Sequence, residues 1–237
     1  MKNIKISDYD ISIYDNGPVG ISLSAGADSA LLLYILMSNI KHHIHIYTIL
    51  APNRRAPFES HADAVVKKCS ELTGNTNFTH HKIHPAKQMP DIVFRYLDER
   101  YIEDQLEIIY FGLTNFPPRS VYLEFDEQQP RWHNEFRDDT VIKPLYGIKI
   151  EIKEQEDLQY VSGNPNNSVK EICIDEKVYV PFVNLNKKDI AKMYHELGIV
   201  NTVFPVSRSC ENDDHLGSHC GKCWWCNERK WAFGFLE

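Results

Sequence analysis

The sequence predicts an α/β fold built on a doubly wound parallel sheet. Short apolar segments typical of strands alternate with segments typical of helices. The strands are expected at 19–23, 44–50, 78–83 and 108–113, and the helices at 29–38, 60–72 and 91–106. Helices therefore occupy the gaps in which an antiparallel sheet would have hairpin turns. We expect neighbouring strands to run parallel and the helices to cover the sheet.

Local signals place the individual elements. Two further short strands are expected at 2–6 and 9–14, and a turn at 16–18 leads into the first core strand. Leu32, Ile35 and Leu36 form one apolar face of the first helix. A glycine that stops a helix follows the second helix at position 74. These signals support the alternating order.

In the second half of the chain, the alternation of strands and helices is interrupted and then resumes. Residues 114–177 contain Pro117-Pro118, an acidic and aromatic stretch and a strand-like segment at 148–152, and they are interpreted as an insertion or lid. A fifth core strand is expected at 178–185, and Asn186 is positioned to cap a helix at 187–197. We expect a main α/β domain over 1–200 and a short tail over 201–237 packed on it.

Composition and charge exclude several classes of protein. The 237 residues carry a formal net charge of −7, which argues against a sequence-independent grip on nucleic acid. The longest apolar run, 30–37, is too short to span a bilayer. The first residues lack the apolar stretch of a secretory signal, so a cytoplasmic protein without a membrane partner is expected.

Four of the six cysteines lie together in the tail. They are Cys210, Cys220, Cys223 and Cys226. Four thiolates can close a tetrahedron around Zn²⁺, and such closed sites are structural. The C-x-x-C-x-x-C spacing also occurs in iron–sulfur proteins. We favour zinc because nothing else in the sequence suggests redox chemistry.

A loop of small residues follows the first core strand. It reads Ser24-Ala25-Gly26-Ala27-Asp28-Ser29 and leads directly into a helix. Backbone N–H groups of such a loop and of the helix N-terminus form an anion site. Asp28 would repel a phosphate unless a cation such as Mg²⁺ lies between them. The alternative is an ordinary tight turn at the start of a helix.

This loop resembles that of the PP-loop ATP pyrophosphatases, the adenine nucleotide alpha-hydrolases. Ser24, Gly26, Asp28 and Ser29 match their S-G-G-x-D-S motif, whereas Ala25 replaces the first glycine. The resemblance implies a Rossmann-like fold that binds ATP through residues 24–29 and transfers AMP to a substrate oxygen. Ala25 keeps its N–H donor, but a positive φ there would cost roughly 1–2 kcal/mol.

The tail resembles the C-terminal signature of the 7-cyano-7-deazaguanine synthase family. The matching residues are Ser209, Cys210, Cys220, Gly221, Cys223, Cys226, Arg229, Ala232 and Phe233. Pro181 and Lys187 match a further segment of that family. The resemblance implies a Zn²⁺ site at the four cysteines and a phosphate-holding role for Lys187.

The family also implies a reaction and its participants. An ATP-dependent carbon–nitrogen ligase of queuosine biosynthesis would adenylate 7-carboxy-7-deazaguanine and convert it with ammonia, through an amide, to the nitrile. Asp28 and Lys187 are the residues expected to be catalytic, and Arg54 or Arg55 is expected to face the nucleotide or substrate. The family further suggests a homodimer.

Other functions remain open at this stage. The Arg-Asn-Thr segment of the family is missing before the fourth strand, which leaves room for a PP-loop ligase or a nucleoside- or protein-modifying enzyme with a different acceptor. A tRNA thiolase with an iron–sulfur cluster and a non-catalytic, zinc-stabilised nucleotide-binding module are further alternatives. The histidines at 42, 43, 45, 80 and 81 are expected to be solvated or packed, because no carboxylate pattern accompanies them.

Overall fold

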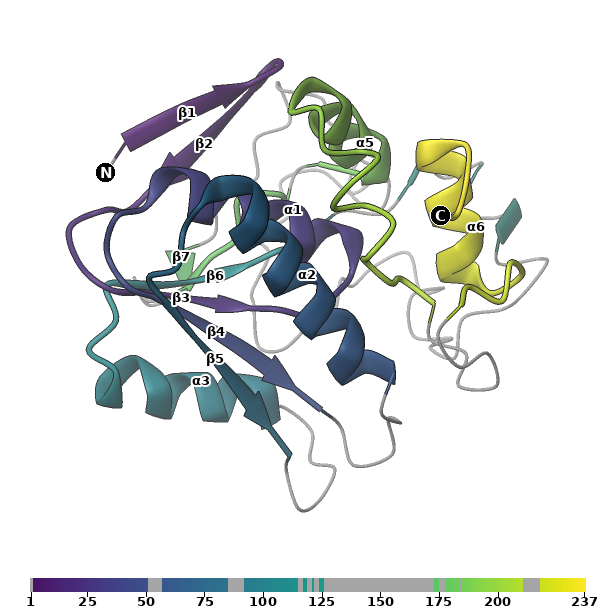
Figure 1. Cartoon of the computed structure of the whole chain (residues 1–237). Helices are drawn as coiled ribbons and strands as arrows, with labels where there is room; N and C mark the ends of the chain where they lie inside the picture. Colours follow the sequence, from purple (N-terminus) through teal and green to yellow (C-terminus); the bar gives the residue numbers. More distant parts are fainter. Residues whose placement is uncertain are drawn as a thin grey trace.

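The computed structural model describes residues 2–50, 57–84, 92–114, 117–118, 121, 124–125, 173–174, 178–183, 185–210 and 218–237. The α/β fold class predicted from the sequence is confirmed (Figure 1). The main-sheet strands are β3 (Val19–Ser22), β4 (Ile44–Ile49), β5 (Phe78–Ile83), β6 (Ile108–Phe111), β7 (Cys173–Ile174) and β8 (Val178–Tyr179). The helices are α1 (Ala27–Asn39), α2 (Pro57–Thr73), α3 (Ile92–Glu103), α5 (Lys187–Glu196) and α6 (Trp224–Phe233).

Five strands of the sheet run parallel in the order β5-β4-β3-β6-β8, and β7 adds an antiparallel edge. The chain moves outward from β3 to one side through β4 and β5, and then returns to the other side of β3 to form β6. Ligands of open α/β sheets bind at such a reversal, beyond the carboxyl ends of the strands. Here that position holds the loop after β3 and the loop after β6.

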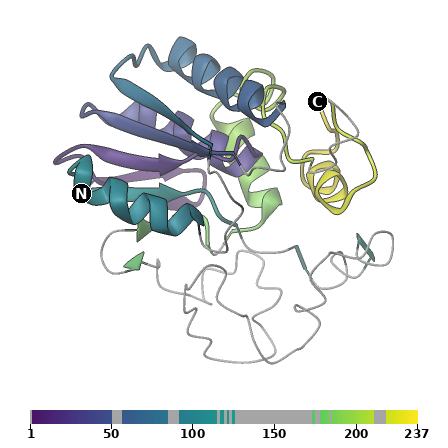
Figure 2. The ribbon, with the colours of Figure 1, turned by 90° about the horizontal axis from the view of Figure 1, so that it is seen from below.

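Helices cover both faces of this sheet, and alternation along the strands explains why. In β6, Ile108 and Tyr110 join the core formed with α1, α2 and α5, whereas Ile109 and Phe111 join the core on the side of α3. Figure 2 shows α2 and α3 on opposite sides of the strands. Strands buried on both faces are expected in a parallel sheet.

The first two strands form a separate hairpin. β1 (Lys2–Ile6) and β2 (Tyr9–Ile13) pair antiparallel and do not join the main sheet. The Tyr9 hydroxyl donates a hydrogen bond of 2.5 Å to Asp189 of α5, and Tyr110 accepts one of 2.8 Å from the backbone of Tyr14. The hairpin therefore braces α5 against the sheet.

The fifth core strand is shorter than predicted. The sequence suggested a strand over 178–185, but β8 ends at Tyr179 and a turn occupies 181–183. Pro181 has no N–H to donate to a sheet ladder, and the Leu185 N–H bonds to the carbonyl of Phe182 instead. The turn delivers the chain to Asn186, whose side chain accepts from Lys188 N and so caps α5 as predicted.

The tail lies beyond the end of the sheet to which the parallel strands point (Figure 1). The division into 1–200 and 201–237, and the insertion or lid over 114–177, stay predictions. No helix in the described ranges has the length and apolar character needed to cross a membrane.

Candidate functional site

The loop after β3 is closed by hydrogen bonds between its own small residues. The hydroxyls of Ser24 and Ser29 lie 3.1 Å apart, Gly26 N–H donates to Ser24 Oγ, and Ser29 Oγ donates to the Gly26 carbonyl. Gly26 is the N-cap of α1 and has no side chain to cap the helix. Gly26 therefore leaves the first N–H groups of α1 uncapped. An anion-binding loop requires such uncapped N–H groups, because they bind the anion.

Ala25 adopts the conformation that glycine would favour. Its φ is +62°, so its backbone lies in the left-handed region, which costs a residue with a Cβ roughly 1–2 kcal/mol. Ala25 is completely buried, and its carbonyl accepts a 2.8 Å hydrogen bond from the backbone N–H of Arg208. The tail thus holds the strained residue in place.

Asp28 and Lys187 meet, although 159 positions separate them in the chain. Lys187 Nζ donates to Asp28 Oδ2, and Thr114 Oγ1 donates to the same oxygen at 3.4 Å. The side chains of Lys187 and Asp28 are only 10% and 13% exposed, respectively. Lys187 lies in the first turn of α5, so the cap at Asn186 and the hairpin contact at Asp189 position it.

Two further contacts fix the first turn of α1. The Tyr194 hydroxyl of α5 donates to the Ala27 carbonyl at 2.9 Å. A Cβ on Gly112, just after β6, would lie 2.7 Å from the backbone of Ser29 and 2.9 Å from that of Asp28. The close approach of β6 to α1 therefore requires glycine at this position.

Asp28 also has an oxygen that fits a cation. Asp28 Oδ1 is buried and has no hydrogen-bond partner among the described residues. A buried carboxylate oxygen is costly without a partner, and Mg²⁺ takes carboxylate oxygens readily. The residues present therefore fit the Mg²⁺ expected from the sequence.

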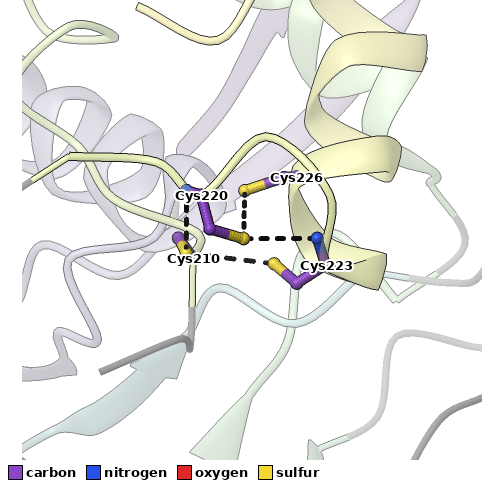
Figure 3. A group of neighbouring side chains, drawn as sticks. All are labelled: Cys210, Cys220, Cys223 and Cys226. Atoms are coloured by element: carbon purple, nitrogen blue, oxygen red, sulfur yellow. Dashed lines mark hydrogen bonds between the residues drawn. The ribbon is translucent and has the colours of Figure 1, made fainter. Parts of the chain in front are cut away.

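The four tail cysteines converge, as predicted (Figure 3). Their sulfur atoms all lie within 4.8 Å of one another, with Cys220 3.8 Å from Cys226 and Cys210 3.9 Å from Cys223. A tetrahedron with Zn–S bonds of about 2.3 Å has edges of about 3.8 Å. The distances are consistent with a zinc site.

The backbone around the cysteines is shaped for sulfur ligands. Cys220 N–H donates to Cys210 Sγ at 3.4 Å and Cys223 N–H donates to Cys220 Sγ at 3.3 Å. Gly221 has a φ of +75°, which allows a tight turn between Cys220 and Cys223. The hydrogen bond with Cys210, together with burial, raises the pKa of the Cys226 thiol to about 12. A bound divalent cation reverses this, because thiolates are the ligands that zinc takes.

Arg229 joins the end of the chain to the segment that precedes the cysteines. It is 1% exposed and donates to the carbonyls of Phe204 and Leu236, each at 2.7 Å, and to the Ser207 hydroxyl at 3.0 Å. Burial lowers its pKa to about 10, so it stays charged at neutral pH. These contacts give Arg229 a packing role in the tail.

The structure brings most of the predicted site residues together. Residues 24–29, Asp28 and Lys187 share one site, whereas Arg54 and Arg55 lie outside the described residues. Sequence reasoning missed Thr114, Gly112 and the backbone of Arg208. Of these, only Gly112 could have been recognised in the sequence, because a glycine directly after a strand indicates that another backbone segment packs closely against it.

Together these features define a class: an α/β protein with a parallel sheet, a small-residue loop at its switch point and a C-terminal four-cysteine cluster. A family model described as queuosine biosynthesis protein QueC matches residues 162–236. The match contains Lys187 and all four cysteines, and it confirms the family resemblance that the tail predicted. No curated protein matches the chain.

Proposed function

We propose that this protein is an ATP-dependent carbon–nitrogen ligase that converts 7-carboxy-7-deazaguanine to the nitrile with ammonia. The observation that carries the proposal is the meeting of Lys187, from the segment that matches QueC, with Asp28 of the loop after β3. The loop that resembles an ATP-binding motif and the segment that matches the family thus contribute to one site.

The reaction has to activate a poor electrophile twice. The substrate carboxylate attacks the α-phosphorus of ATP, and pyrophosphate leaves. Ammonia then attacks the acyl adenylate, AMP leaves, and a proton is lost to give the amide. The amide oxygen is adenylated by a second ATP, again with release of pyrophosphate, and loss of AMP and of both amide protons gives the nitrile.

The site residues would position phosphates and neutralise charge rather than act as nucleophiles. The N–H groups of the loop and of the first turn of α1 would hold phosphate oxygens. Lys187 would exchange its contact with Asp28 for one with phosphate, while Asp28 Oδ1 would hold Mg²⁺. Bound Mg²⁺ supplies charge neutralisation between Asp28 and the nucleotide.

Zinc would have a structural role and would not take part in the reaction. The four cysteines would hold it in a closed site, and the segment before Cys210 contacts the loop through the Arg208 N–H and the Ala25 carbonyl. Family resemblance further leads us to propose a cytoplasmic homodimer. Sedimentation of the purified chain tests the dimer.

The decisive experiment measures pyrophosphate release with ATP, Mg²⁺, ammonium and 7-carboxy-7-deazaguanine, with and without that acceptor. We expect acceptor-dependent release and formation of the nitrile. Lys187→Ala should lower the rate at least tenfold. Lys188→Ala is the matched control, because the neighbouring lysine is exposed and lies over the Trp231 ring, and its rate should stay within twofold.

Two alternatives give different results in the same assay. A PP-loop enzyme with another acceptor would bind ATP but release no pyrophosphate with the deazaguanine; this alternative is favoured by the family match starting only at residue 162. A non-catalytic nucleotide-binding module would release none with any acceptor, and it is favoured by the strained Ala25. Either result would overturn the proposed substrate.

A further inference from the structure

A second group of metal-ligating side chains lies on the face of the sheet that α3 covers. It consists of His45 of β4, His81 of β5 and Asp104, which follows α3. One ligand atom from each residue lies within 4.8 Å of the others. Their sequence separations hide the group, because it forms only when β4 pairs with β5 and α3 packs across them.

The register of the sheet brings the two histidines together. Tyr47 of β4 pairs with His81, so His45 lies one diagonal step away on the same face. The two imidazole rings stack at 5.3 Å with an interplanar angle of 6°, and His45 Nδ1 lies 3.1 Å from His81 Nε2. The two ring nitrogens, which here share a hydrogen bond, therefore lie at one position.

Asp104 brings a carboxylate to that position. Its Oδ2 lies 3.6 Å from His45 Nδ1 and accepts a hydrogen bond of 2.6 Å from the buried Tyr47 hydroxyl. Outer hydrogen bonds of this kind orient the ligands of metal sites. Arg100 adds positive charge on this face, but it forms an ion pair with Glu103.

The neighbouring histidines are engaged elsewhere. His43 directs its two ring nitrogens to Asn77 and Thr79, each at 2.8 Å. His80 faces the opposite side of the sheet, where Thr48 and Asp63 lie beside its nitrogens. Within the described chain, the convergence of ring nitrogens on a carboxylate is thus specific to His45 and His81.

We propose that His45, His81 and Asp104 bind a divalent transition-metal ion, which is Zn²⁺ under physiological conditions. The three residues leave one coordination position for water. Ligand atoms of a tetrahedral zinc site lie about 3.3 Å apart. His45 Nδ1 lies 3.1 Å from His81 Nε2 and 3.6 Å from Asp104 Oδ2, on either side of that value. The side chains of His45 and Asp104 are 15% and 18% exposed, so solvent reaches the group.

The position of the group indicates a structural role. His45 lies near the amino end of β4, whereas the loop with Asp28 follows the carboxyl end of the adjacent β3. The ion would therefore clamp β4, β5 and the end of α3 at the opposite end of the sheet from the nucleotide loop. This inference does not depend on the proposed enzymatic reaction.

The test is the metal content and stability of the full chain after saturation with Zn²⁺ and dialysis. We expect two zinc equivalents per chain, of which the second raises the melting temperature. His45→Gln, His81→Gln and Asp104→Asn should each retain one equivalent and lose that rise. His43→Gln, at the residue directly before β4, is the matched control and should retain two.

Cobalt distinguishes this group from the cysteines. The first Co²⁺ equivalent should bring the thiolate-to-metal charge-transfer absorption of a four-cysteine site, and the second should add only weaker ligand-field bands. Cys226→Ser should disturb the first and spare the second. Tyr47→Phe should weaken the second site by roughly 10- to 100-fold.

Two results would overturn the proposal. One is a single metal equivalent in the wild-type chain, which would make the group a hydrogen-bonded network that shares a proton. The other is a second equivalent that persists in His45→Gln and His81→Gln while far-UV circular dichroism shows both variants folded.

Discussion

Gly112 is the position where a single methyl group should damage the candidate nucleotide site. It lies just after β6, and a Cβ there would come within 2.7 Å of Ser29 N and Cα and 2.9 Å of Asp28 C. These contacts are roughly 0.7 Å short of ordinary van der Waals distance, and backbone atoms cannot rotate away. Since the φ of Gly112 is not positive, the whole effect of Gly112→Ala is steric.

The expected magnitude follows from two opposed terms. Overpacking costs about 1–3 kcal/mol, and the smaller chain entropy of alanine in the unfolded state returns about 0.4–1 kcal/mol. We expect a net loss of about 1–2 kcal/mol, which lowers the urea midpoint by about 0.5 M for a slope of about 2–3 kcal/mol/M. The first turn of α1, which carries Asp28, must also shift. Because a misplacement of about 1 Å can cost 10²-fold in rate, acceptor-dependent pyrophosphate release should fall at least tenfold.

Gly17→Ala is the control, because the nearest atom to its Cβ is Glu107 Cβ at an ordinary 3.8 Å and the φ of Gly17 is not positive either. Its midpoint should be unchanged or slightly raised. The reasoning would be refuted if Gly112→Ala matched Gly17→Ala in both the urea midpoint and the rate of pyrophosphate release.

Three further changes test other parts of the structure. Ala25→Gly should alter the free energy of unfolding by less than about 1 kcal/mol, because relief of the left-handed strain offsets a lost methyl group and added chain entropy; urea unfolding measures it. Arg229→Lys should destabilise the chain by roughly 3 kcal/mol in the same assay, because one ammonium cannot serve the carbonyls of Phe204 and Leu236 together. Burial lowers the pKa of His61, so the unfolded state binds the proton first as the pH falls through about 6.5, and stability is lost on acidification. His61→Gln should reduce the loss of stability between pH 7.5 and 5.5, and an equal loss in both proteins would contradict the assignment.

The sequence by itself determined features whose signals are local. Apolar residues at helix and strand spacing predict the order of elements from Val19 to Phe111, because each pattern lies within one element. The spacing of the last three tail cysteines likewise predicts their convergence, since a few residues of backbone keep them in reach. The small residues at 24–29 predict a loop that leads into a helix.

Tertiary structure decided whatever depends on pairing between distant segments. The meeting of Asp28 with Lys187 requires that the chain reverse around β3 and that α5 be braced by the hairpin. The positive φ of Ala25 is imposed by its surroundings, since nothing local to alanine favours it.

The histidines show the same limit. They are expected to be solvated or packed because the sequence shows no carboxylate pattern beside them, yet in the fold His45 and His80 lie beside Asp104 and Asp63. Those partners come from α2 and from the end of α3, and a strand pattern contains no information about which helix will cover it. Strand register and helix packing are set by burial over the whole chain, so only the folded structure reveals which side chains become neighbours.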